Sequence, residues 1–247
     1  MRSEGEPPMI AVERLSIGYG ETVILEDLDF AVPNGEVFAI LGGSGSGKST
    51  LLRNLIGLDL PLAGRVLVGG APPAQVLGPP RFGVLFQSGA LFGSMTLAEN
   101  VALPLRKWSD LDANAIDVIV RAKLRLVGLE GFENHLPAEV SGGMKKRAGI
   151  ARALALDPPL LFLDEPSAGL DPIRSVELDE LILTLNRSLG VTTVLVTHEL
   201  ASIFAVACEC ILVDRDARGI IARGRPLELR DGSPDPRVRS FFNRRLA

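Results

Sequence analysis

The sequence has few of the residues that would build a metal site or a disulfide framework. It contains two histidines and two cysteines, and both cysteines, Cys208 and Cys210, lie in the apolar run AVACECILV. Thiols in a strand-like apolar segment are typical of the buried interior, and half of a metal site is the alternative. We therefore expect buried structural thiols and no zinc site. A chain of 247 residues is long enough to bury a core without such support.

Long apolar runs and basic blocks are also missing. No run approaches the roughly 20 residues that span a bilayer, and the first residues, MRSEGEPPMI, carry charge and proline where a signal peptide is apolar. The formal net charge is −4, without a cluster of Lys and Arg, which argues against a protein that coats nucleic acid. The sequence predicts a cytosolic chain that reaches a membrane only through a partner, and no nucleic-acid partner.

Short apolar runs that stop at polar or glycine residues predict strands of a mostly parallel sheet. Apolar residues at helical spacing lie between several of these runs, and the start of the chain, 9–40 and 64–70, is rich in strand patterns. The predicted fold class is therefore α/β, as a single domain over residues 1–247. The runs are 36–41, 81–86, 160–164, 192–197 and 210–214.

Helical character fills the interval between the second and third of these strands. It predicts an inserted helical subdomain over 88–156, in which Thr96 and Glu99 have the spacing of a capping box at a helix start. The segment 231–247 is rich in turn residues and then basic. We expect it to be a solvated C-terminal tail, with a binding site as the alternative.

A phosphate-binding loop is predicted at GGSGSGKST, residues 42–50. This stretch directly follows the strand at 36–41 and opens a helix, which is the context that a G-x-x-x-x-G-K-[ST] motif requires; a glycine turn that caps a helix is the alternative. We expect backbone N–H groups to surround the β- and γ-phosphates, with Lys48 adding a charge and Ser49 a magnesium ligand. The predicted nucleotide-binding residues are Gly42, Gly43, Ser44, Gly45, Ser46, Gly47, Lys48, Ser49 and Thr50.

Two carboxylates end the strand LLFLD at 160–164. Asp164 and Glu165 emerge beside the phosphate loop if the two strands are neighbours. Asp164 is then placed to hold magnesium through water, and Glu165 to polarise the attacking water. On its own the pair is as well explained by a capped turn. Together with the phosphate loop it predicts hydrolysis of a nucleotide.

With these motifs the sequence resembles the ATP-binding cassette family from about residue 9 to 230. SGGMK at 141–145 is similar to the family's signature, LLFLDEP at 160–166 to its second nucleotide motif and SAGLDP at 167–172 to its D-loop, all in the family's order. The resemblance implies an ATPase that uses ATP and Mg²⁺. It also implies a RecA-like P-loop NTPase core with an N-terminal antiparallel β subdomain and an inserted α-helical subdomain.

Three further residues take roles from this resemblance. Tyr19 stands where the family stacks a ring on adenine, and His198 where it contacts the γ-phosphate. Gln87, at the junction between the core and the helical insert, stands where the family senses the nucleotide and its magnesium ion. By the residues alone, the alternatives are a packing role for Tyr19, a helix cap for His198 and an idle surface side chain for Gln87.

The resemblance also implies a homodimer with shared sites. In this family two cassettes pair head to tail about a two-fold axis. Ser141 and the N–H groups of Gly142 and Gly143, at the positive end of a helix dipole, then close on the γ-phosphate of the ATP that the other copy holds. Met144 stands where many family members have glutamine, so a polar contact from that side chain to the nucleotide is absent.

Three stretches resemble a narrower group, the ATPase subunits of Mla-type phospholipid transporters, which work with MCE-domain proteins at the cell envelope. They are LFQSGALFGSMTLAENVALPL, SGGMKKRAGIARALALDPPLLFLDEPSAGLDPI and DPRVRSFFN. This implies a peripheral subunit on the cytoplasmic face of the inner membrane, bound to an integral-membrane permease and working with an MCE-type lipid-binding protein. An amino-acid or drug transporter is the alternative, followed by a soluble cassette ATPase of DNA repair or translation.

A surface for the permease is predicted at the start of the helical insert. Apolar residues cluster there and would receive a coupling helix, or else belong to the core of the subdomain. They are Leu91, Phe92, Met95 and Leu97.

Overall fold

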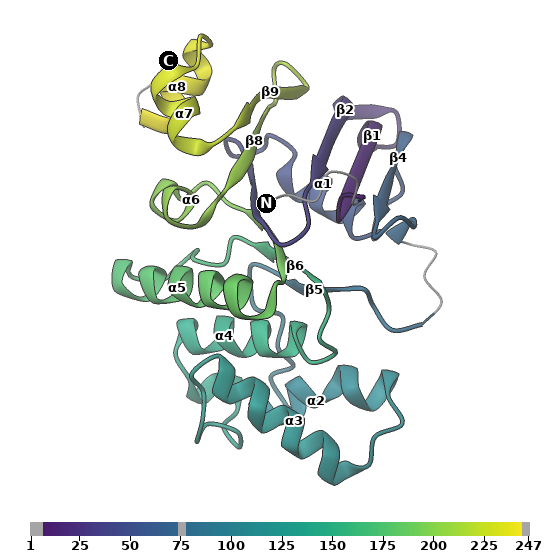
Figure 1. Cartoon of the computed structure of the whole chain (residues 1–247), viewed down its shortest axis with the longest axis vertical. Coiled ribbons are helices and arrows are strands. Elements are labelled where there is room, and N and C mark those ends of the chain that lie inside the picture. Colours follow the sequence, from purple (N-terminus) through teal and green to yellow (C-terminus); the bar gives the residue numbers. More distant parts are fainter. Residues whose placement is uncertain (1–6, 74–77, 244–247) are drawn as a thin grey trace. The chain divides into compact units, whose positions relative to one another are not determined.

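The computed structural model describes residues 7–73 and 78–243, which form two compact units. Unit 1 combines Met1–Leu77 with Thr192–Ala247, and unit 2 is Gly78–Val191. Their elements are labelled in Figure 1. None of the helices in the described ranges combines the length and hydropathy that a bilayer span requires.

Unit 1 begins with an antiparallel sheet. Strand β1 (Ile10–Tyr19) pairs with β2 (Thr22–Val32) and with β4 (Ala63–Val68), in the order β2-β1-β4. Between β1 and β2 the chain reverses at Gly20, whose φ of 57° lies in the left-handed region that favours glycine. The strand-rich start predicted from the sequence is thereby confirmed.

The other strands of unit 1 are mostly parallel. Strand β3 (Val37–Leu41) pairs in parallel with β7 (Thr192–Val196) and with β8 (Glu209–Asp214), and β9 (Gly219–Gly224) runs antiparallel to β8. Every residue of β3 and β7 is buried, as expected of parallel strands covered on both faces. The predicted strands at 36–41, 192–197 and 210–214 are confirmed to within a residue.

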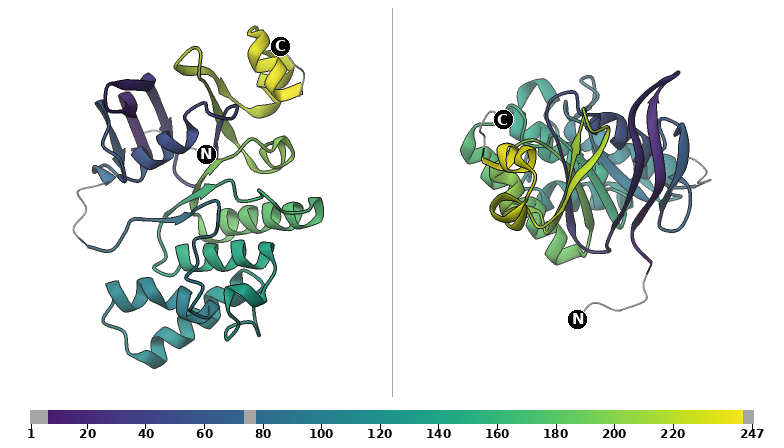
Figure 2. Two further views of the ribbon diagram at one scale, coloured as in Figure 1. Left: turned by 180° about the vertical axis from the view of Figure 1, so that it is seen from behind. Right: turned by 90° about the horizontal axis from the view of Figure 1, so that it is seen from above.

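Two helices of unit 1 follow these strands. Helix α1 (Lys48–Leu55) comes after β3 and lies against β1 and β4, as Figure 2 shows, and α6 (Leu200–Val206) comes after β7. Both lie where apolar spacing predicts helices.

Unit 2 combines two parallel strands, β5 (Phe82–Leu85) and β6 (Leu160–Asp164), with helices. Between these strands lie α2 (Leu97–Trp108), α3 (Ala113–Leu126), a short 3₁₀ turn η2 (Pro137–Glu139) and α4 (Gly142–Ala153), and α5 (Pro172–Leu189) follows β6. Helices α2, α3 and α4 contact one another, in teal in Figure 1. Helices therefore fill the predicted range, and the limits 88–156 of a subdomain stay a prediction.

The capping box predicted for α2 is present. The Thr96 hydroxyl accepts a hydrogen bond from the N–H of Glu99 (3.1 Å), and the Glu99 carboxylate accepts one from the N–H of Thr96 (2.8 Å). These two bonds satisfy donors that the first turn of a helix otherwise leaves unpaired.

The C-terminal segment is folded, so the prediction of a solvated tail over 231–247 is wrong for its described part. Helix α7 (Pro226–Gly232) ends just inside it and α8 (Pro236–Asn243) lies within it, and Val238 and Phe242 of α8 are buried against residues of α6 and β8. These apolar residues are four positions apart and so share one helix face. The last four residues, 244–247, lie outside the described part.

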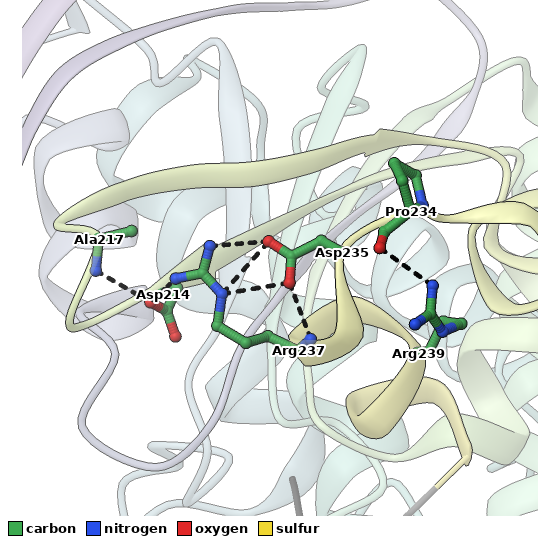
Figure 3. Close-up of polar contacts among 6 residues, drawn as sticks. All are labelled: Asp214, Ala217, Pro234, Asp235, Arg237 and Arg239. Carbon is green, nitrogen blue, oxygen red and sulfur yellow. Dashed lines mark hydrogen bonds and ion pairs between the residues drawn. The ribbon is translucent and has the colours of Figure 1, made fainter.

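An arginine at the start of α8 forms ion pairs with two aspartates. Arg237 Nη2 lies 2.7 Å from Asp235 Oδ2, and its Nη1 lies 3.1 Å from Asp214 Oδ1 at the end of β8 (Figure 3). Asp214 also accepts a hydrogen bond from the N–H of Ala217 (2.9 Å), within the turn that leads to β9. Three acidic neighbours, Asp235, Asp214 and Asp216, raise the pKa of Arg237, chiefly through the hydrogen bond to Asp235.

The two cysteines lie in different surroundings, which corrects half of the prediction. Cys210 is buried in β8, where its Sγ donates to the carbonyl of Gly224 (3.3 Å), and burial raises the pKa of this thiol to about 12. Cys208 is exposed, because it precedes the strand, which begins only at Glu209.

Candidate nucleotide and catalytic site

The predicted phosphate-binding loop joins β3 to α1 in unit 1. Gly45 and Gly47 have φ of 73° and 95°, in the left-handed region where a side chain is strained. A Cβ on Gly42 would lie 2.6 Å from the carbonyl oxygen of Val213, so the packing of the loop also requires glycine there. A Cβ on Gly43 or Gly45 would meet no protein atom within 4 Å, so these glycines border open space.

A cleft of about 730 Å³ lies over this loop. This volume falls within the roughly 300–1,000 Å³ of small-molecule sites. The hydroxyl of Ser46, buried in the loop, has no hydrogen-bond partner among the described residues, which is uncommon for a buried polar group. The lining comes from Thr22–Ile24 of β2, Gly45–Thr50 of the loop and α1, and Arg215, Asp216 and Arg218 of the β8–β9 turn.

The acidic and basic residues of that turn were not found by sequence reasoning. Arg215 and Arg218 are exposed, and they reach the cleft because β8 pairs directly with β3, the strand that leads into the loop. No sequence motif marks these turn residues. The only sequence signal is their position at the end of a strand that neighbours β3.

Lys48 is buried at the first position of α1. Its Nζ donates hydrogen bonds to the carbonyls of Gly42 (2.8 Å) and Gly43 (2.9 Å). These two hydrogen bonds hold the positive charge of the ammonium group, which has three N–H donors, against the loop. The structure thus brings the predicted lysine to the predicted glycines.

Tyr19 ends β1 in the same unit. Its hydroxyl shares a hydrogen bond with the hydroxyl of Thr50 (3.2 Å), while the residue is 57% exposed. The ring is therefore not a core packing residue, and a tyrosine held at its tip presents a face on which a flat ligand can stack.

His198 follows β7, also in unit 1. Its side chain is exposed, and its Nε2 lies 3.6 Å from Glu199 Oε1. The N-cap of α6 is Glu199, and the N–H of Glu199 is bound by the Thr197 hydroxyl (3.1 Å). His198 therefore lies one position before the N-cap of this helix.

Unit 2 holds the predicted glutamine and carboxylates. Gln87 is exposed just after β5, and β6 ends at Asp164. Glu165 has a φ of 45°, a left-handed conformation that costs a non-glycine residue about 1–3 kcal/mol and persists only where the surrounding structure holds it.

A residue that sequence reasoning did not single out joins these two positions. Lys146 of α4 is buried, and its Nζ donates to the backbone carbonyl of Gln87 and to that of Glu165 (3.2 Å). The sequence signal was the basic pair in SGGMKKR, which reads as a solvated helix face.

The signature segment forms the start of α4. Ser141 is the N-cap, and its hydroxyl accepts a hydrogen bond from the N–H of Met144 (3.3 Å). Gly142 and Gly143 have negative φ, and a Cβ on either would lie 3.8 Å or more from its nearest neighbour, a methyl group of Leu170. Neither the backbone nor the packing of this chain requires glycine at these positions.

The comparison with protein families decides the identity. A family model described as ABC transporter matches residues 25–168, which is more than half of the chain. The chain belongs to the ABC transporter family. It has the ABC ATPase fold, binds ATP and hydrolyses it, as the ATP-binding subunit of an ABC transporter. ATPases of this family form dimers and work with permease subunits.

Two relatives and one solved structure are similar to this ABC ATPase over most of its length. The probable ribonucleotide transport ATP-binding protein mkl of Mycobacterium leprae is 43% identical over 98% of this chain and 72% of that protein. The intermembrane phospholipid transport system ATP-binding protein MlaF of Escherichia coli K12 is 40% identical, over 95% of this chain and 88% of MlaF. The dimeric cassette MJ0796, in a post-hydrolysis state with ADP and Pi, superimposes with a TM-score of 0.77 at 29% identity, over 88% of this chain and 98% of that one.

Proposed function

We propose that this ABC ATPase energises phospholipid transport, as the peripheral cytoplasmic subunit of an inner-membrane permease that works with an MCE-type lipid-binding protein. The observation that carries the proposal is the 40% identity to MlaF, a phospholipid transport ATPase by name, over almost the whole chain. The name of mkl supports a second cargo, a ribonucleotide, at a similar level of identity. Amino-acid and drug cargoes remain further alternatives.

The nucleotide is bound, in this proposal, by the residues of unit 1. The backbone of the loop and the charge of Lys48 hold the β- and γ-phosphates, and the exposed ring of Tyr19 stacks on adenine. His198 donates a hydrogen bond to the γ-phosphate, which is lost when ATP becomes ADP. Glu165 polarises the attacking water, and Gln87 responds to the bound nucleotide.

The residues present fit a magnesium ion held together with a nucleotide. Within the described ranges, no group of three or more His, Cys, Asp or Glu side chains is placed to hold a metal, whereas Mg²⁺ usually keeps several waters and takes only a few protein ligands beside substrate phosphates. The exposed Ser49 hydroxyl on the cleft is one such ligand, and we propose Asp164 and Gln87 as the others. The ion neutralises phosphate charge when it is bound.

The dimer is proposed to place each signature over the partner's ATP. The support is that Gly142 and Gly143 are not required by their own chain, so the demand for glycine comes from outside it. Ser141 caps α4 as an acceptor and keeps its hydroxyl proton for a phosphate oxygen. These residues stand at the positive end of a helix dipole, which favours an anion.

The cargo is tested with the complete complex in vesicles. We expect ATP-dependent transfer of a labelled phospholipid between donor and acceptor vesicles, and none when the complex carries Glu165→Gln. Labelled ribonucleotide, amino acid and drug are offered in parallel. Movement of one of these without movement of lipid would overturn the phospholipid proposal.

A permease contact is proposed at Phe92. The residue is 56% exposed, but its backbone is fixed: the buried side chain of Asn100 accepts from the N–H of Phe92 (2.8 Å) and donates to its carbonyl (3.1 Å). A rigid, exposed aromatic is typical of an interface anchor. Leu97 is fully buried, so for this residue the core alternative holds.

Changing Phe92 to Glu should therefore weaken assembly with the permease by about tenfold or more, because interface aromatics contribute roughly 2 kcal/mol or more. The measurement is co-purification with the permease and its titration in detergent. Val118→Glu is the matched control, since Val118 is 67% exposed on α3 and should tolerate the same charge. Retained assembly of Phe92→Glu would remove this residue from the interface.

A further inference from the structure

Lys146 is buried between two segments that the proposed mechanism uses. The residue is 6% exposed, and its Nζ donates to the carbonyl of Gln87 and to the carbonyl of Glu165 (3.2 Å). Burial lowers the pKa of Lys146, while the carboxylates of Asp164 and Glu165 oppose that shift. A buried ammonium is costly unless its donors are satisfied, so its place is set by these acceptors.

Helix α4 also contacts the rest of the segment 87–90, called here the Gln87 segment, at two further points. Arg152 donates to the carbonyls of Ala90 (2.8 Å) and Gly89 (3.2 Å). Between the two cations, Gly149 packs so closely that a Cβ there would lie 2.5 Å from a methyl carbon of Leu85 and 3.2 Å from the Gly89 carbonyl oxygen. Positions 146, 149 and 152 are three residues apart and share one helix face. This face of α4 therefore binds and packs against the Gln87 segment, which follows β5.

The contact with Glu165 falls on a strained backbone. Glu165 is left-handed, with a φ of 45°, and a left-handed residue needs support from its surroundings to persist. The carbonyl of this same residue accepts from the ammonium of Lys146 and from the N–H of Ala168 (3.1 Å), and both donors restrain its ψ angle. The carboxylate of Glu165 leaves the same Cα, so its direction depends on this restraint.

We propose that Lys146 is a positioning residue for hydrolysis, which fixes the backbone of Glu165 and ties it to the Gln87 segment. The signature glycines begin the helix that carries Lys146, so a displacement of the signature is transmitted to both carbonyls. The inference rests on the proposed roles of Glu165 and Gln87. It adds a residue that the phosphate loop, the carboxylate pair and the signature do not include.

The test is Lys146→Met in the full chain, which removes the charge and keeps the length. We expect kcat for ATP hydrolysis to fall about tenfold or more, equivalent to about 1.4 kcal/mol of transition-state stabilisation. KM and nucleotide affinity should change less than about twofold, because a loss confined to the transition state lowers kcat and kcat/KM together. Lys146→Arg, which keeps several charged donors, should restore most of the rate. Lys107→Met is the matched control, because Lys107 is an exposed lysine on α2 of the same unit, outside the signature.

A double-mutant cycle separates positioning from general destabilisation. If Lys146 acts through the Glu165 carboxylate, Lys146→Met should cause little further loss in a Glu165→Gln background, measured in single turnovers. Equal fractional losses in both backgrounds, lost nucleotide affinity or an unimpaired kcat would overturn the inference. If Lys146→Met fails to fold, Lys146→Gln takes its place, and we expect the same fall in kcat with little change in KM. Normal turnover of Glu165→Gln would instead overturn the proposed role of Glu165.

Discussion

Glu165→Gln is expected to slow ATP hydrolysis by about 10²–10⁴, the usual contribution of a positioned general base, and to leave ATP binding intact. Glutamine has nearly the shape of glutamate and leaves the left-handed backbone at this position unchanged, so only the proton acceptor is lost. The residues predicted to bind the nucleotide through the loop all belong to unit 1, whereas Glu165 belongs to unit 2. The variant should therefore bind ATP and accumulate as an ATP-bound dimer.

Turnover, ATP affinity and dimer fraction are measured on the same preparation. Glu180→Gln is the matched control, because Glu180 is an exposed carboxylate on α5 of the same unit, and it should hydrolyse ATP at the wild-type rate. If Glu165→Gln turns over at a near-normal rate, another group activates the water.

The predictions from sequence succeeded where the information is local. The strand at 160–164 has the predicted limits, the capping box joins residues three positions apart, and the loop at 42–50 needs its glycines for φ angles and one close backbone approach. In each case a short motif specifies the geometry of its own backbone. The antiparallel start and the parallel strands likewise follow from apolar patterning.

The failures arise from contacts between distant parts of the chain. The C-terminal segment reads as a solvated tail, but Val238 and Phe242 complete a core built around α6 and β8. Lys146 reads as part of a basic surface, but it reaches a carbonyl 59 positions earlier. Cys208 lies one residue outside the strand that buries Cys210. Periodicity cannot show which neighbour covers a helix face or which loop binds a cation.

A dimer with shared sites makes a stronger prediction, because identical mutations should have different effects in two arrangements. Lys48→Ala removes a charge-assisted contact to phosphate, and such contacts contribute roughly 1.5–3 kcal/mol. Ser141→Arg places a long side chain where the proposal brings the partner's γ-phosphate. When the two changes lie on different chains, both fall on one composite site, and the other site keeps an intact loop and an intact signature.

When both changes lie on one chain beside a wild-type partner, each composite site receives one defect. This arrangement should leave no competent site. The cost of each mutation to folding is the same in both arrangements, so stability cannot explain a difference between them. A dimer that carries Lys48→Ala on just one of its two chains, and no other change, keeps one intact site. Its ATPase rate calibrates the turnover of a single site.

The most direct test of the account is the ATPase rate of these two dimers, isolated through different tags and bound to the permease. The shared-site account predicts that the dimer with the mutations on different chains matches the single-site calibration and that the same-chain double mutant falls to background. If each signature served the ATP of its own chain, the ranking would invert and the same-chain double mutant would be the more active. That result would contradict the proposal that Gly142 and Gly143 are glycines because a partner's nucleotide approaches them.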